Sequence, residues 1–114
     1  MILFLNTAGF ERLHFAVISG KRVKSKKISI KYPETEMALA YLDKFLREQK
    51  VKPVQIKKII AVSGEGSFTG IRVGFALASA FSLALGIPVY AIESSKLPSN
   101  LSALNGIKLK KRLT

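Results

Sequence analysis

The stretch that decides the fold is Gly64-Glu65-Gly66-Ser67-Phe68-Thr69-Gly70, a glycine-rich loop between two apolar segments. The run 57–63 precedes it and the long segment 71–85 follows it, which predicts a buried strand, a loop and a helix. Such glycines can present backbone N–H groups to an anion such as phosphate, and the hydroxyls of Ser67 and Thr69 would then add hydrogen bonds. Alternatively, they let the strand and the helix pack closely. The packing role is favoured, because no Lys-Ser or Lys-Thr pair follows the last glycine as in a P-loop.

The remaining elements follow from alternating apolar patterns and from turn residues. The predicted order is β-β-β-α-β-α-β, with strands at 1–5, 13–18, 23–32, 57–63 and 88–92 and helices at 35–50 and 71–85. Lysines along 23–32 are typical of an edge strand, and Gly86 is a C-terminal cap for the second helix. We expect an α/β fold, a mixed five-stranded sheet with helices mainly on one face. Residues 1–97 form this lobe, and 98–114 are expected to be a basic, flexible tail.

Composition limits the possible functions. The chain has 114 residues, enough for one domain, and a formal net charge of +12. Basic residues cluster at 21–31 and 108–112 with few aromatics between them, so RNA contact would involve phosphate without sequence reading. Many small soluble proteins are basic without binding nucleic acid, and that alternative stays open.

The residue types also argue against catalysis and metal binding. No cysteine is present, and the one histidine, His14, is expected to be an ordinary strand residue. No His–carboxylate pair or Ser-His-Asp set is visible, so we expect no enzyme, no metal and no cofactor. The longest apolar stretch is a poor membrane span, which predicts a cytoplasmic protein without membrane contact.

The second helix lacks the charged face of an ordinary surface helix. Arg72 is its only charged residue, and Ala76, Ala80 and Ala84 form a small-residue ridge that would let another helix approach. Arg72 is unfavourable near a helix N-terminus, so we expect a carboxylate partner, either Glu65 or one on another subunit. The alternative is that helix 35–50 and the tail cover this face. The predicted partner interface consists of Met37, Tyr41, Arg72, Val73, Ala76, Leu77, Ala80, Phe81 and Ala84.

These residues resemble the N-terminal half of the TsaB (YeaZ) family, partner subunits in making threonylcarbamoyladenosine on tRNA. The matching segments are 2–8, 64–74 and 86–92. The family motif G-P-G-S-F-T-G-[LIV]-R-[LIV]-G differs here only at Glu65. The resemblance covers residues 1–97, most of this chain and about half of a usual family member.

The resemblance implies an actin-like ATPase lobe with ribonuclease H topology. It also implies a non-catalytic scaffold that pairs through its helices with a TsaD-like catalytic subunit or with a second copy. Family members usually have Asp where this chain has Asn6, and Asn supplies no negative metal ligand. The usual second lobe is absent, so the chain is either naturally reduced or a fragment. The alternatives are a nucleotide-binding actin-like lobe and a basic tRNA-binding module.

Overall fold

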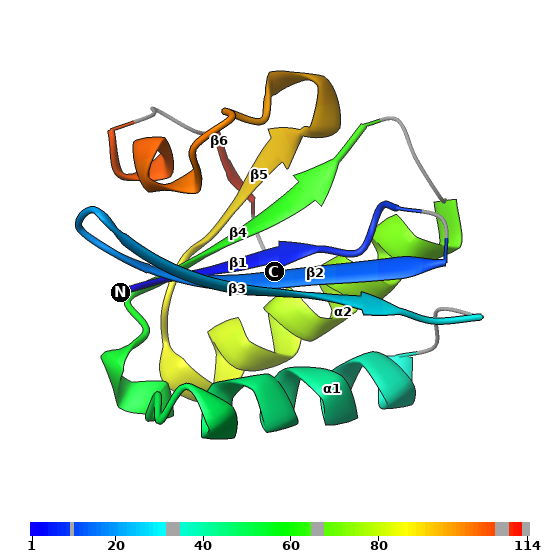
Figure 1. Ribbon diagram of the computed structural model, residues 1–114, viewed down its shortest axis with the longest axis horizontal. Helices are drawn as coiled ribbons and strands as arrows, with labels where there is room; N and C mark the ends of the chain where they lie inside the picture. The colour runs from blue at the N-terminus through cyan, green and yellow to red at the C-terminus, as the bar shows by residue number, and fades with distance from the viewer. Residues whose placement is uncertain (10, 32–34, 65–67, 107–109, 113–114) are drawn as a thin grey trace.

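Six strands form one mixed sheet in the order β3-β2-β1-β4-β5-β6 (Figure 1). The computed structural model describes residues 1–9, 11–31, 35–64, 68–106 and 110–112. Antiparallel pairs join β1 to β2, β2 to β3 and β5 to β6, and parallel pairs join β1 to β4 and β4 to β5. The strands are β1 (Ile2–Asn6), β2 (Arg12–Ser19), β3 (Arg22–Ser29), β4 (Lys58–Ser63), β5 (Val89–Glu93) and β6 (Lys110–Arg112).

The five predicted strands and both helices are confirmed, with ends that shift by a few residues. The helix α1 (Thr35–Glu48) and the helix α2 (Phe68–Leu85) lie on the same face of the sheet (Figure 1). Gly86 caps α2 as predicted: its φ is +66°, and its N–H donates to the Ser82 carbonyl at 2.8 Å. Within the described residues there are also three short 3-10 helices, η1 (Pro53–Gln55), η2 (Ser94–Lys96) and η3 (Leu101–Asn105).

The main core lies between the sheet and the two helices. Leu5 and Phe15 from the sheet meet Phe45 of α1 and Leu77 of α2, all without measurable exposure or nearly so. Val73 of α2 belongs to the same cluster at 5% exposure. Val73 and Leu77 were assigned to the partner interface from the sequence, and the structure places them instead in the chain's own core.

A second, smaller core covers the opposite face of the sheet. Phe4 and Ile60 pack there against Leu104 of η3, which is fully buried. The side chain of Asn105 donates from Nδ2 to the Gly20 carbonyl at 2.7 Å and so ties η3 to the β2–β3 turn. Sequence patterns predicted a flexible tail from residue 98 and gave no sign of this packing. The domain boundary at residue 97 stays a prediction, and residues 107–109 and 113–114 lie outside the described part.

Candidate interaction site on helix α2

The position of α2 depends on a close approach between its first turns and the end of β1. The Thr7 side chain is 1% exposed, and its hydroxyl donates to the Gly70 carbonyl. A Cβ added at Gly74 would lie 2.3 Å from Thr7 Oγ1, closer than any real contact. Gly70 and Gly74 are four residues apart and therefore share one face of the helix. The backbone of α2 can approach Thr7 only because Gly74 has no side chain.

The rest of the predicted glycine loop is only partly described. Gly64 has a φ of +87°, a left-handed conformation that favours glycine, as the chain leaves β4. Phe68, Thr69 and Gly70 already belong to α2, and Thr69 is exposed. Glu65, Gly66 and Ser67 lie outside the described residues. The predicted pairing of Arg72 with Glu65 and the phosphate role of the loop therefore stay predictions.

The opposite side of α2 carries an exposed strip that is almost free of charge. We call it the α2 stripe, and it consists of Thr69, Arg72, Ala76, Ala80, Leu83 and Ala84. The spacing of three and four residues places them on one helical face. Leu83 is 78% exposed, and no part of the described chain covers the stripe. A helix packed only against its own sheet would turn charged residues to water here.

Four of the nine residues assigned to the interface from the sequence lie on this stripe: Arg72, Ala76, Ala80 and Ala84. Phe81 is half-buried and packs against the main core, as do Met37 and Tyr41 of α1. The sequence analysis did not single out Leu83, although its position three residues after Ala80 was a usable signal. A shallow depression at the first turns of α2 is lined by Thr69, Arg72, Val73 and Ala76.

The first turn of the chain, where the family usually has a carboxylate, serves the local structure. Asn6 Oδ1 accepts a hydrogen bond from the Ala8 N–H at 3.1 Å, which closes the turn after β1. Among the residues that the structure describes, no three His, Asp or Glu side chains gather closely enough to hold a metal ion. Within the same residues, neither helix has the length and apolarity needed to cross a membrane.

Comparisons with known proteins agree on the family. The model of the family TsaD, tRNA N6-adenosine threonylcarbamoyltransferase, matches residues 34–99, more than half of the chain. An uncharacterized protein of Mycobacterium tuberculosis is 35% identical over 88 residues, which cover 77% of this chain and 40% of that protein. The tRNA threonylcarbamoyladenosine biosynthesis protein TsaB of Bacillus subtilis is 29% identical over 94 residues, 82% of this chain and 41% of that protein. The chain thus spans about two fifths of the length of these curated relatives.

Comparison with solved structures supports the same family and also identifies the fold. YeaZ from Pseudomonas aeruginosa superposes with a TM-score of 0.72 at 26% identity, over 81% of this chain and 43% of that one. RuvC of Thermus thermophilus, solved with a Holliday junction substrate, superposes with a TM-score of 0.62 over 97% of this chain and 98% of that one. Its identity is only 9%, so it shows the fold alone, an α/β lobe of the ribonuclease H and actin-like type. From the matched family model and the likeness to TsaB and YeaZ, this chain belongs to the TsaB (YeaZ) branch of the tRNA N6-adenosine threonylcarbamoyltransferase family.

Proposed function

We propose that this chain is a non-catalytic, cytoplasmic partner subunit that binds a TsaD-like catalytic subunit through the α2 stripe and supports tRNA threonylcarbamoylation. The observation that carries the proposal is the exposure of a helical face with a single charged residue, on a member of this family. Exposed apolar surface of this kind marks contact with another polypeptide.

The shape of the stripe favours a helix as the contacting element. Ala76, Ala80 and Ala84 follow one another at a spacing of four, which makes a low ridge between two grooves. Alanine ridges allow interaxial distances near the lower end of the usual 8–10 Å range, roughly 8 Å. Leu83 supplies an exposed apolar side chain beside the ridge. A second copy of the chain is an alternative occupant of the same surface.

The experiment is a binding assay between this chain and a purified TsaD-like protein, read by size-exclusion chromatography with light scattering. Ala80→Arg places a charged side chain in the middle of the ridge and should abolish association with the partner and with a second copy. The matched control is Ala103→Arg, since Ala103 is exposed on η3 across the sheet. Circular dichroism should show both variants folded. A wild-type chain that stays monomeric and ignores TsaD, or an Ala80→Arg variant that still associates, would contradict the proposal.

The nucleotide-binding alternative receives less support from the structure. The Asn6 side chain, at the position of the family's carboxylate, is uncharged and already accepts the Ala8 N–H. A metal-bound nucleotide would need negative oxygen ligands here. We expect calorimetry with ATP and magnesium to show no binding to this chain.

A further inference from the structure

Three basic side chains share the sheet face opposite α1 and α2. Strand pairing places His14 of β2 beside Asn6 of β1 on one side and beside Lys27 of β3 on the other. Arg12 lies two residues before His14 on β2, so it points to the same face. The His14 ring packs edge-on against Phe4 of the second core at 5.6 Å, which identifies this face. We call Arg12, His14 and Lys27 the basic row.

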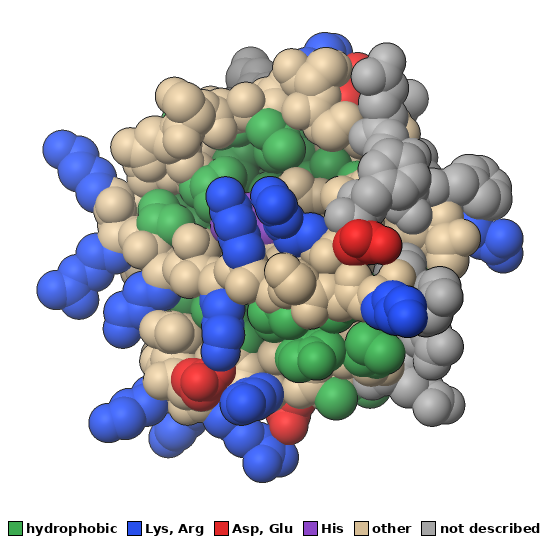
Figure 2. All heavy atoms as spheres, turned by 45° about the vertical axis from the view of Figure 1, so that its right-hand side comes forward, with side chains coloured by type: hydrophobic (Ala, Val, Ile, Leu, Met, Phe, Trp, Pro, Cys, Tyr) green, Lys and Arg blue, Asp and Glu red, His purple; other side chains and the backbone are tan. Residues whose placement is uncertain are grey.

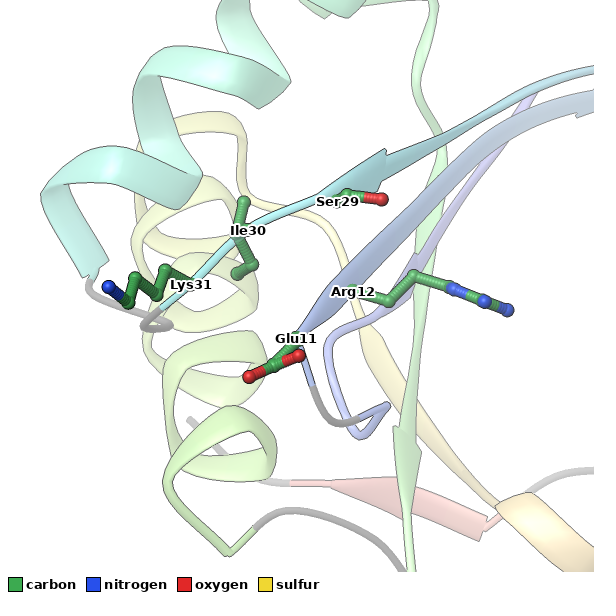
Figure 3. Close-up of a pocket in the computed structure, with 5 residues that line it drawn as sticks. All are labelled: Glu11, Arg12, Ser29, Ile30 and Lys31. Atoms are coloured by element: carbon green, nitrogen blue, oxygen red, sulfur yellow. The ribbon is translucent and has the colours of Figure 1, made fainter.

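The cations of this row have no acidic partner among the described residues. The ion pairs in that part of the chain are Lys26–Glu48, Arg47–Asp43 and Lys96–Glu93, which leave out Arg12 and Lys27. Figure 3 shows the side chains of Glu11 and Arg12 pointing in opposite directions, although both residues line the same open depression with Ser29, Ile30 and Lys31. The carboxylate nearest in sequence therefore does not neutralise the row.

The pKa of His14 is affected by the positive charges of the basic row. Its pKa is lowered by burial and by the neighbouring charges of Lys27 and Arg12. Its Nε2 atom is buried and has no hydrogen-bond partner within the described chain. Figure 2 shows Lys and Arg side chains gathered over the histidine, on an open part of the surface with apolar side chains beside it. Both Arg12 and Lys27 are exposed.

From this arrangement we infer that the basic row binds the phosphodiester backbone of a nucleic acid. A guanidinium matches the oxygens of a phosphate with two parallel hydrogen bonds, and an ammonium adds a mobile point charge. Arg12 of β2 and Lys27 of β3 are diagonal neighbours on adjacent antiparallel strands, roughly 7–8 Å apart. They can therefore contact successive phosphates of an extended polymer rather than one ion. The surface is open rather than a closed pocket, which suits a polymer better than a compact ligand.

The inference is independent of the proposed pairing with TsaD. The basic row lies on the opposite face of the sheet from the α2 stripe, so a nucleic acid and a protein partner can be bound at the same time. The row would contact the phosphate backbone of the nucleic acid and not its bases. We therefore expect affinity without sequence preference.

The test is fluorescence anisotropy of this chain with a labelled tRNA transcript, titrated from about 50 to about 200 mM salt. Each lost phosphate contact lowers the log–log salt slope by about 0.7 to 0.9. Raising the salt concentration four-fold weakens the binding of both proteins. For the double variant Arg12→Ala/Lys27→Ala, this loss of affinity should be about ten-fold smaller than for wild type. The charge-keeping double variant Arg12→Lys/Lys27→Arg should retain most of the wild-type slope.

The matched control removes two charges elsewhere. Lys44 on α1 and Lys52 before η1 are both exposed, and Lys44→Ala/Lys52→Ala should leave the salt slope unchanged. Absence of tRNA binding, or an equal change of slope in the control, would overturn the inference. Equally tight binding of polyglutamate or of anionic phosphatidylserine vesicles to the basic row would assign it to an acidic protein or to a membrane instead. None of these measurements involves TsaD, so their failure would not affect the proposed function.

Discussion

Replacing Gly74 by alanine should destabilise this protein, although the same change in most helices is stabilising. Alanine in a helix interior is favoured over glycine by about 1 kcal/mol. Here the new methyl group would lie 2.3 Å from Thr7 Oγ1. Relieving that overlap requires α2 to move away from β1 or Thr7 to change its rotamer, and both disturb the hydrogen bond to Gly70.

The size of the effect follows from two destabilising contributions and one stabilising contribution. Overpacking of a core costs about 1–3 kcal/mol, and a buried hydroxyl that loses its partner costs about 1–3 kcal/mol more. After the gain in helix propensity, we expect a net loss of about 3 kcal/mol in the free energy of unfolding of Gly74→Ala. A loss of that size in a domain of about 100 residues lowers the melting temperature by roughly 10 °C or more.

Urea denaturation followed by circular dichroism measures this directly, and Thr7→Ala supplies the control. Without Oγ1, the nearest Thr7 atom to the added methyl group is its Cβ at 3.6 Å, an ordinary contact. The double variant should therefore be at least as stable as Thr7→Ala alone, which gives a coupling energy of about 3 kcal/mol. If Gly74→Ala raised the stability, or if the two changes were additive, the reasoning about this junction would be refuted.

Two further predictions concern the sheet face opposite the helices. His14 has a lowered pKa in the folded state, so its neutral form contributes stability that is complete above pH 6.5 and is lost as the pH falls toward the folded value. Unfolding free energies at about pH 7.5 and about pH 5 should therefore differ less in His14→Phe than in wild type, and equal pH dependence would contradict this. Leu104→Ala should lower the stability by about 2–5 kcal/mol because it empties a fully buried site under η3, whereas Ala103→Gly, exposed beside it, should cost less than about 1 kcal/mol. Equal losses in these two denaturation curves would show that η3 does not pack as described.

The sequence was sufficient for the elements whose signals are local. Alternation identified β2, the long apolar segment after the glycine-rich loop identified α2, and Gly86 marked the end of α2 because its positive φ is a local requirement. The contacts that define the site are not local. Thr7 and Gly70 are 63 residues apart, and no periodicity links them.

The same limit explains why some residues predicted for the interface lie in the core, and why the sequence analysis missed other contacts. A helix that is apolar on all sides gives no indication of which side meets the sheet, so Val73 and Leu77 could not be separated from Ala76 and Ala80. The burial of Leu104 depends on a contact with the distant strands of the second core. β6 has three residues, all basic, and forms only through its pairing with β5.

Asn6 links the family resemblance to the chemistry of the sheet face. It is the strand partner of His14, which is in turn the partner of Lys27. An aspartate at this position would bring a carboxylate next to His14 and would favour its protonated form. It would lie two strands from Lys27 and would lower the positive potential of the row from that distance. With asparagine the amide closes the turn at Ala8 and adds no charge, so the row keeps its positive potential. The substitution therefore removes a negative oxygen that a metal-bound nucleotide would need, and it leaves a surface whose charge suits a phosphate backbone.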